Sequence, residues 1–409
     1  MSKTETKRER IVCIDRFRGT AIFAMIFFQA AERFSSLGVL SRIANHLLDE
    51  GIVIMPGMVL ADIVAPIFFL VIALNYIPSF RQRAGRDGKK AAYLHFVIRY
   101  LAILGFGCCI KTIENVFDGQ TDAFDTICLV CTVIALVSGI ATLLLGISEK
   151  TARARAVVRK ILIASLAAAG AICIVSSSVN AYQIFYLDTH KNYWGVLQSI
   201  GAAGLIMLLF VESGAAVRGA AAGFLFVIYA FFHEIPGNME LIDVDVQGGL
   251  SGILGWTSML LAFSVMADLY YRDRAARLGG RTGAAAHSYL IGLAVLVVLG
   301  IAGGLLFVVN KGSVSPGYIL VNLPISAFLF WLFSLTDGWE PRLRPLTWWG
   351  ISPVIMYLLQ YLLVDVVLSL ADGLTGLSFV PALCYVIGVT LVITAIAYLL
   401  HRKQKAIRM

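Results

Sequence analysis

The sequence predicts an all-α, polytopic membrane helix bundle of about 12 transmembrane helices (10–12), with both termini in the cytoplasm. Three observations predict it: the composition, the recurrence of long apolar runs, and the alternation of basic loops. Of the 409 residues, 59% are hydrophobic and only 14% are charged, and the mean hydropathy is +0.83. Soluble domains carry about 25% charged residues. The composition therefore excludes a water-soluble globule, and we expect one continuous membrane domain over residues 1–409.

Apolar runs recur from residue 19 to residue 400, so the hydrophobic excess is not confined to a single anchor. A transmembrane helix needs about 20 mostly apolar residues. On that scale the predicted spans are 13–34, 58–79, 92–112, 124–147, 157–179, 193–212, 217–234, 249–271, 287–309, 317–335, 346–370 and 378–400.

The loops between these spans predict the orientation, because lysine and arginine favour the cytoplasmic side. With the N-terminus inside, 25 basic residues fall in cytoplasmic segments and 5 in outer segments, and Arg16, Arg18 and Arg99 lie within helices. Every second loop is basic, which favours an even number of spans. The net charge of +8 is therefore explained by topology, and we expect no nucleic-acid partner.

The first apolar run is expected to be a retained span. No small-residue cleavage site follows it, and charged residues lie at its start, so no cleavable signal peptide is predicted. The seven cysteines lie inside or at the ends of apolar runs. Cys128 and Cys131 form a C-x-x-C spacing, but no second pair or nearby histidine completes a ligand set, and no metal site is predicted.

Polar side chains inside the spans are the candidate functional residues, since such groups are costly in a bilayer. In the predicted topology five of them share one depth near the outer side: Gln29, Asp62, Gln198, Asn322 and Asp365. Two interpretations stay open. The five groups line one polar chamber, or each is satisfied by its own neighbours.

A second group of charged residues lies at the predicted cytoplasmic side: Asp15, Arg16, Arg18 and Arg99. These side chains either pair with each other, as an Asp–Arg contact at i, i+3 would, or hold an anionic cofactor, since arginine binds phosphate well. On the outer side, His46 lies in the loop that leads to Asp62, and histidine is the commonest general base near neutral pH. A loop histidine that is simply solvated is the alternative.

Several short elements carry a resemblance to a known family. Residues 15–19 match a D-x-x-R-G element, and residues 61–68 match A-D-x-x-x-P-x-F. Residues 195–200 match G-V-L-Q-R-I except that Ser199 replaces the arginine. Asn310-Lys311 and the pair Gly350 and Tyr357 match later elements in the same order. The chain thus resembles the transmembrane acyltransferases, and more narrowly the heparan-α-glucosaminide N-acetyltransferase family and its bacterial relatives.

The resemblance implies an enzyme that moves an acetyl group from cytosolic acetyl-CoA, its donor substrate, to an amino or hydroxyl group of an extracytoplasmic sugar or glycan. It also implies a bacterial cytoplasmic (inner) membrane as the location, and a homodimer is left open. On this hypothesis His46, Asp62 and Gln29 are catalytic. Asp15, Arg16, Arg18 and Arg99 bind the cofactor, and Gln198, Asn322 and Asp365 bind the acceptor.

Two alternatives remain at this point. A multi-pass transporter or flippase would use the same polar groups as a midplane site, although no inverted repeat is visible in the sequence. A catalytically inactive relative is the other alternative, because the family places a histidine about ten residues before the aspartate of its A-D element, where this chain has none.

Overall fold

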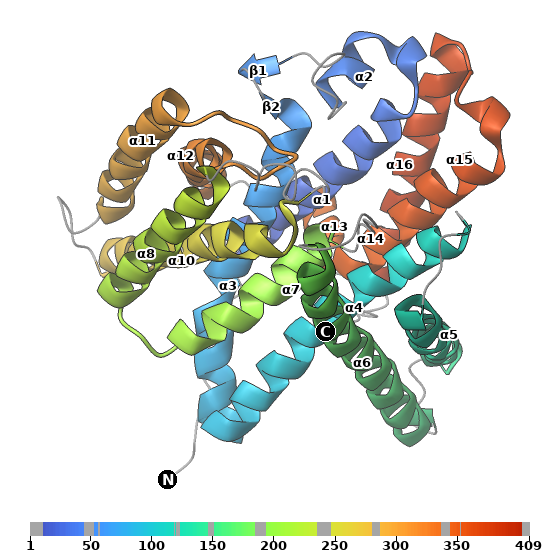
Figure 1. Cartoon of the computed structure of the whole chain (residues 1–409), viewed down its shortest axis with the longest axis horizontal. Coiled ribbons are helices and arrows are strands. Elements are labelled where there is room, and N and C mark those ends of the chain that lie inside the picture. The colour runs from blue at the N-terminus through green and yellow to red at the C-terminus, as the bar shows by residue number, and fades with distance from the viewer. Residues whose placement is uncertain are drawn as a thin grey trace. The chain divides into compact units, whose positions relative to one another are not determined.

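The structure is a computed structural model that describes residues 11–44, 53–55, 58–117, 119, 123–145, 151–184, 194–234, 247–279, 287–336, 344–351 and 353–402. Nearly all of these residues are helical, so the all-α prediction is confirmed (Figure 1). The long helices are α1 (Val12–Glu32), α3 (Val64–Asp87), α4 (Lys89–Phe117), α5 (Ala123–Leu144), α6 (Ala152–Ile184), α7 (Val196–Met207), α8 (Ala215–Glu234), α10 (Gly249–Leu278), α11 (Ser288–Leu306), α12 (Pro316–Ser334) and α16 (Phe379–Arg402).

The shorter elements join or interrupt the long helices. They are η1 (Ser35–Leu37), α2 (Val39–Ala44), β1 (Val53–Met55), β2 (Met58–Val59), η2 (Leu60–Ile63), η4 (Leu208–Phe210), α13 (Arg344–Ile351), α14 (Pro353–Gln360), the π-helix η6 (Tyr361–Val366), α15 (Val367–Leu370) and η7 (Asp372–Leu374).

Among the described residues, nine helices are long and apolar enough to cross a membrane. They coincide with nine of the twelve predicted spans, and they make the chain an integral, multi-pass membrane protein. The other three predicted spans are also helical but depart from a simple span. Asp15, Arg16 and Arg18 lie within α1, the helix at residues 196–210 is short, and the eleventh span contains the π-helix η6.

The chain divides into two compact units. Unit 1 contains residues 1–55, 59–71 and 326–408, and unit 2 contains residues 56–58 and 72–325. Six candidate residues of the described chain belong to unit 1: Asp15, Arg16, Arg18, Gln29, Asp62 and Asp365. Arg99, Gln198 and Asn322 belong to unit 2, so the single chamber shared by all five intramembrane groups stays a prediction, as does the single domain.

The core of unit 1 is built around α1. Its buried residues come from α1, α13, α14, η6 and α16, and include Ile22, Ile26, Trp349 and Ile393. At one end Phe17 packs against two rings of α12, with its centroid 5.3 Å from that of Phe330 and 5.4 Å from that of Phe333. Hydrophobic and aromatic packing therefore fixes α1 along its length.

Unit 2 is built around α4 and α10, which pack against α6, α7 and α8. The closest approach is between α4 and α6. A Cβ added at Gly105 would lie 1.8 Å from the backbone oxygen of Leu166, and one added at Gly170 would lie 2.2 Å from that of Leu101. Small residues at helix crossings are typical of membrane bundles.

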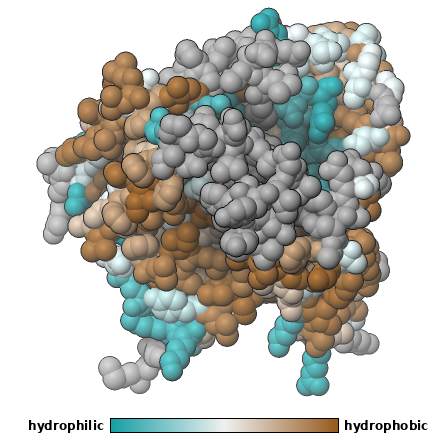
Figure 2. Space-filling view, viewed as in Figure 1, coloured by the Kyte–Doolittle hydropathy of each residue, from teal (hydrophilic) through white to brown (hydrophobic). Residues whose placement is uncertain are grey.

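The outer faces of several helices are apolar and exposed, as lipid contact requires. Figure 2 shows apolar side chains over much of the viewed surface, with hydrophilic side chains projecting where α3 meets α4 and at one end of α6. Those ends carry exposed basic residues that the sequence assigns to two cytoplasmic segments: Arg81, Arg86, Lys89, Lys90, Arg153, Arg159 and Lys160.

Within unit 2, segments predicted to face the same side contact each other. Lys89 of a predicted cytoplasmic loop pairs at 3.0 Å with Glu212, the last residue of predicted span 193–212, at its cytoplasmic end. Tyr229 bonds to the turn at Ser313, and both lie near the predicted outer side. These contacts agree with the alternation of loops; the count of twelve and the side that each terminus faces stay predictions.

Candidate functional site

The two motif elements at opposite ends of the chain contact each other in unit 1. A Cβ added at Gly19 would lie 1.7 Å from the backbone oxygen of Leu346, and one added at Gly350 would lie 2.2 Å from that of Asp15. Neither position accepts a larger side chain without moving backbone. The glycines of the D-x-x-R-G element and of the Gly350 element therefore allow α1 and α13 to cross in close contact.

The charged residues of the D-x-x-R-G element make polar contacts near this crossing of α1 and α13. Arg18 pairs with Asp15 at 3.3 Å and donates to the backbone oxygen of Gly350 at 3.0 Å. The buried Arg16 donates to the backbone oxygen of Thr336 at 3.0 Å. The i, i+3 pairing expected from the sequence is confirmed. These contacts are structural in kind, and the assignment of the three residues to cofactor binding stays a prediction.

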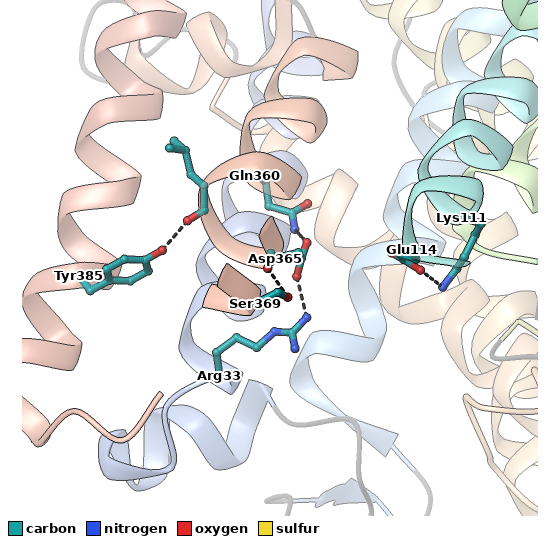
Figure 3. A network of polar contacts seen from close by, with 8 residues as sticks. Arg33, Lys111, Glu114, Gln360, Asp365, Ser369 and Tyr385 are labelled. Atoms are coloured by element: carbon teal, nitrogen blue, oxygen red, sulfur yellow. Dashed lines mark hydrogen bonds and ion pairs between the residues drawn. The ribbon is translucent and has the colours of Figure 1, made fainter. Parts of the chain in front are cut away.

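The other end of α1 contributes to a second polar group, which we call the Asp365 cluster: Arg33, Gln360 and Asp365. Arg33 donates to one carboxylate oxygen of Asp365 at 2.7 Å, and Gln360 donates to the other at 2.9 Å. Figure 3 shows the guanidinium and the amide approaching the carboxylate from two sides. Both oxygens of Asp365 therefore accept a hydrogen bond.

The π-helix η6 creates this cluster. In an α-helix residues i and i+4 face each other, whereas a π-helix brings i and i+5 together. Gln360 and Asp365 are five residues apart, so the wider turn aligns them. The hydroxyl of Tyr385 on α16 donates to the backbone oxygen of Leu363 inside the π-helix, so this backbone oxygen has a hydrogen-bond donor from outside the helix (Figure 3).

One acceptor in the Asp365 cluster is left open. Gln360 is 1% exposed, and its Oε1 accepts no hydrogen bond from any residue that the structure describes. A buried acceptor without a donor costs about 1–3 kcal/mol. This oxygen lies beside a carboxylate, and together they suit a ligand that presents hydroxyl or amino groups.

Gln29 and Asp62 also belong to unit 1. Gln29 is half-buried on α1, one turn before Arg33. Asp62 is fully buried, and its carboxylate accepts the backbone N–H of Val59 at 2.8 Å. Asp62 thus caps the start of η2, which contacts α1 and α2. The catalytic roles assigned to both residues stay predictions, and His46 lies outside the described residues.

The remaining candidates lie in unit 2. Gln198 is buried, and its side chain packs against α4. A Cβ added at Gly107 would lie 2.4 Å from Oε1 of Gln198. Asn322 is fully buried and donates to the backbone oxygen of Tyr318 at 2.9 Å. Its Oδ1 accepts from no described residue.

Arg99, the last of them, is half-buried on α4. Its guanidinium lies 5.7 Å from the ring centroid of Tyr100. Its Nε donates to no residue in the described part of the chain. The side chain thus keeps a donor for an anion, and its role in binding a cofactor stays a prediction. No group of residues suited to a metal ion occurs among the residues the structure describes.

Sequence reasoning singled out neither Arg33 nor Gln360, because α-helical spacing does not bring Gln360 to Asp365. It also did not single out Arg218, which is 1% exposed on α8 and pairs with Asp268 of α10.

The comparisons with known proteins do not assign this chain to a family. No model of a known protein family matches the sequence, and no curated protein matches it. The functional conclusion therefore rests on the residues themselves.

Proposed function

We propose that the protein is a membrane-embedded acyltransferase that moves an acyl group, an acetyl group in the first instance, from cytosolic acyl-CoA to an amino or hydroxyl group of an extracytoplasmic sugar or glycan. The proposal includes twelve spans, cytoplasmic termini and a place in a bacterial cytoplasmic membrane.

The observation that carries the proposal is the open acceptor of the Asp365 cluster. Sugars present several hydroxyl or amino donors on a small frame, and a buried amide oxygen beside a carboxylate offers an acceptor to such a donor. Arg33 pairs with Asp365 at 2.7 Å and so holds the carboxylate at this position. The cluster therefore suits the acceptor substrate, as the sequence suggested for Asp365.

The position of this cluster on α1 supports the direction of transfer. Asp15 and Arg33 are 18 residues apart, which corresponds to about 27 Å along a helix. The hydrocarbon core of a bilayer is about 30 Å thick. Helix α1 thus links the D-x-x-R-G element to the Asp365 cluster across one membrane thickness, as a donor on one side and an acceptor on the other would need.

The chemistry requires a base that deprotonates the acceptor and a donor that stabilises the oxyanion formed on the thioester carbonyl. On this proposal His46 or Asp62 serves the first role, and Gln29 or Gln198 the second. Arg16, Arg18 and Arg99 are the candidate partners of the CoA phosphates.

The test uses the purified full chain in lipid nanodiscs with radiolabelled acetyl-CoA and a panel of amino sugars and membrane glycans. We expect label in the glycan fraction. Gln360→Met keeps the side-chain volume but removes the open acceptor, and we expect it to raise the acceptor KM about tenfold, or about 1.4 kcal/mol, while leaving acetyl-CoA binding unchanged. Gln82→Met, an exposed glutamine on α3, is the matched control. Absence of both label transfer and CoA binding would refute the proposal.

A transporter is the second candidate, and the Arg218–Asp268 pair favours it. Ionisable pairs between membrane helices often mark ion or substrate pathways. Ligands stabilise the folded state that they occupy, so thermal unfolding separates the two functions. Stabilisation by CoA supports the acyltransferase, whereas stabilisation by a solute and not by CoA supports transport.

A further inference from the structure

A tight turn between α11 and α12 is held against the end of α8 in unit 2. Tyr229 of α8 donates its hydroxyl to the backbone oxygens of Ser313 and Val314, at 3.0 Å each. Gly248 closes the other side, where its Cβ would lie 2.8 Å from the Ser313 oxygen. The turn is therefore fixed by contacts from two other segments.

Three side chains of different chemistry meet at this turn. Nε2 of His233 lies 3.4 Å from Oγ of Ser313, and Nδ1 of the same ring lies 3.4 Å from a carboxylate oxygen of Glu234. Nδ1 makes no hydrogen bond to a described residue, so Glu234 is an ion-pair neighbour of the imidazole rather than a hydrogen-bond partner. The order of hydroxyl, imidazole and carboxylate is that of a nucleophile, its base and the group beside the base. Such contacts are often long before substrate binds.

The other polar side chains of the turn bond within it. Oδ1 of Asn310 accepts from the N–H of Gly312 at 2.7 Å, and Oγ of Ser315 accepts from the N–H of Asn310 at 2.9 Å. The side chains of Asn310 and Ser315 thus accept hydrogen bonds from the backbone of the turn, whereas the hydroxyl of Ser313 lies beside the imidazole of His233.

Backbone strain marks the same position. Val314 has φ +54°, which a β-branched residue rarely adopts. Strained residues of this kind concentrate at functional sites, where the surrounding structure holds them in place. Tyr229 supplies that restraint through the carbonyl of Val314.

We propose that Ser313 is a nucleophile that carries the acyl group as a covalent ester, with His233 as its base and Glu234 as the positioning residue. The proposal rests on the proposed acyltransferase function, assigns its intermediate, and gives the role of base to His233 in place of His46 or Asp62. His233 takes the proton of the Ser313 hydroxyl as Oγ attacks the thioester carbonyl of acyl-CoA. The C–S bond breaks, and the CoA thiolate takes that proton. The acceptor amine or hydroxyl then attacks the ester, passes its proton through His233 to Ser313, and leaves as the acylated product.

The first experiment incubates the full chain with radiolabelled acetyl-CoA and no acceptor, followed by denaturation and peptide mapping. We expect label on the peptide that contains Ser313, in an ester that resists neutral hydroxylamine. Ser313→Ala removes the label, and Ser313→Cys restores it as a thioester that neutral hydroxylamine cleaves. Ser326→Ala is the matched control, because Ser326 is also fully buried. It should label as the unmodified protein does.

The base and its positioning residue have their own measurements. His233→Gln should slow labelling at least about a hundredfold, the usual contribution of a general base. Glu234→Gln should lower the kcat of acylation without changing the KM for acetyl-CoA, a split that a purely structural role would not produce.

A second experiment keeps the nucleophile testable without acyl-CoA. A fluorophosphonate probe is attacked by an activated serine with loss of fluoride, and it should label Ser313 in a manner that depends on His233. Transfer at the normal rate in Ser313→Ala would overturn the covalent step and leave the acyltransferase standing. Probe labelling without any transfer would refute the acyltransferase and retain the nucleophile. If neither reagent labels Ser313, the proposed nucleophile is wrong.

Discussion

Two arginine–aspartate pairs of the described residues join different helices, and the surroundings of their arginines differ. In unit 2, Arg218 of α8 pairs with Asp268 of α10; the arginine is 1% exposed and the aspartate 35%. In unit 1, Arg33 pairs with Asp365 at 2.7 Å; the arginine is 44% exposed and the aspartate 16%. The arginine is therefore buried in the first pair, which we call the buried pair, and accessible in the second, which we call the exposed pair.

The difference separates an arginine that several contacts hold in place from one that can exchange its partner. Arg218 also donates to the backbone oxygen and the hydroxyl of Ser264, at 3.1 and 2.8 Å, so its charge is held from several directions. Arg33 makes one ion pair that water can reach, which leaves it free to rearrange around a ligand. Burial makes the first pair costly to break, and exposure makes the second inexpensive to exchange.

Breaking the buried pair should have the largest effect on stability. Asp268→Ala leaves the Arg218 charge without its carboxylate inside a helix interface, and such losses cost about 3–5 kcal/mol. The measurement is the free energy of unfolding in micelles, from a denaturant titration. A loss below about 1 kcal/mol would show that Arg218 reaches water or another anion and that the contrast between the pairs is wrong.

Replacing the whole buried pair should recover most of that loss. Arg218→Met combined with Asp268→Leu removes both charges and keeps apolar volume, an exchange that is often neutral or stabilising in buried sites. The double variant should unfold within about 1 kcal/mol of the unmodified protein in the same titration. If it is as unstable as Asp268→Ala alone, the pair contributes specific geometry rather than charge compensation.

The sequence predicted the helical membrane architecture because a bilayer imposes simple physical demands on it. The length and apolar character of a span, and the charge of a loop, can each be read from one segment of the sequence. Two spans depart from the pattern for local reasons: Asp15, Arg16 and Arg18 lie within α1, and the eleventh span contains the π-helix η6. The i, i+3 contact of Asp15 with Arg18 was also predictable, since helical spacing alone produces it.

The candidate site was only partly predictable because its contacts depend on tertiary structure. Asp365 was identified from the sequence as a costly ionisable group in a span. Its contact with Gln360 depends on a π-helix, and the pattern of apolar residues does not predict a π-helix. Asp268 and Arg218 are fifty residues apart, and nothing in either segment specifies the other. Likewise, Ser313 and His233 meet only because Tyr229 and Gly248 hold the intervening turn in place.

Neutralising the exposed pair should change stability far less than breaking the buried one. Asp365→Asn keeps the shape and an acceptor for Arg33, so we expect a loss of about 1 kcal/mol or less. Asp268→Asn is the same substitution in the buried pair and should cost more. The two variants are compared by unfolding in the same micelles, and equal losses would remove the distinction between the pairs.

Removing the exposed arginine should have the smallest effect, and that effect should depend on salt. Arg33→Gln loses one ion pair that is about half open to water, which contributes about 0.2–1 kcal/mol at low ionic strength. Added salt screens exposed charges. The difference in unfolding free energy between Arg33→Gln and the unmodified protein should therefore shrink when the salt concentration rises from about 0.01 M to 1 M, whereas the loss in Asp268→Ala should persist, because burial shields Arg218 from ions. A salt-independent loss in Arg33→Gln would mean that this pair too is shielded from solvent, and the Asp365 cluster would then be a structural contact rather than an accessible binding site.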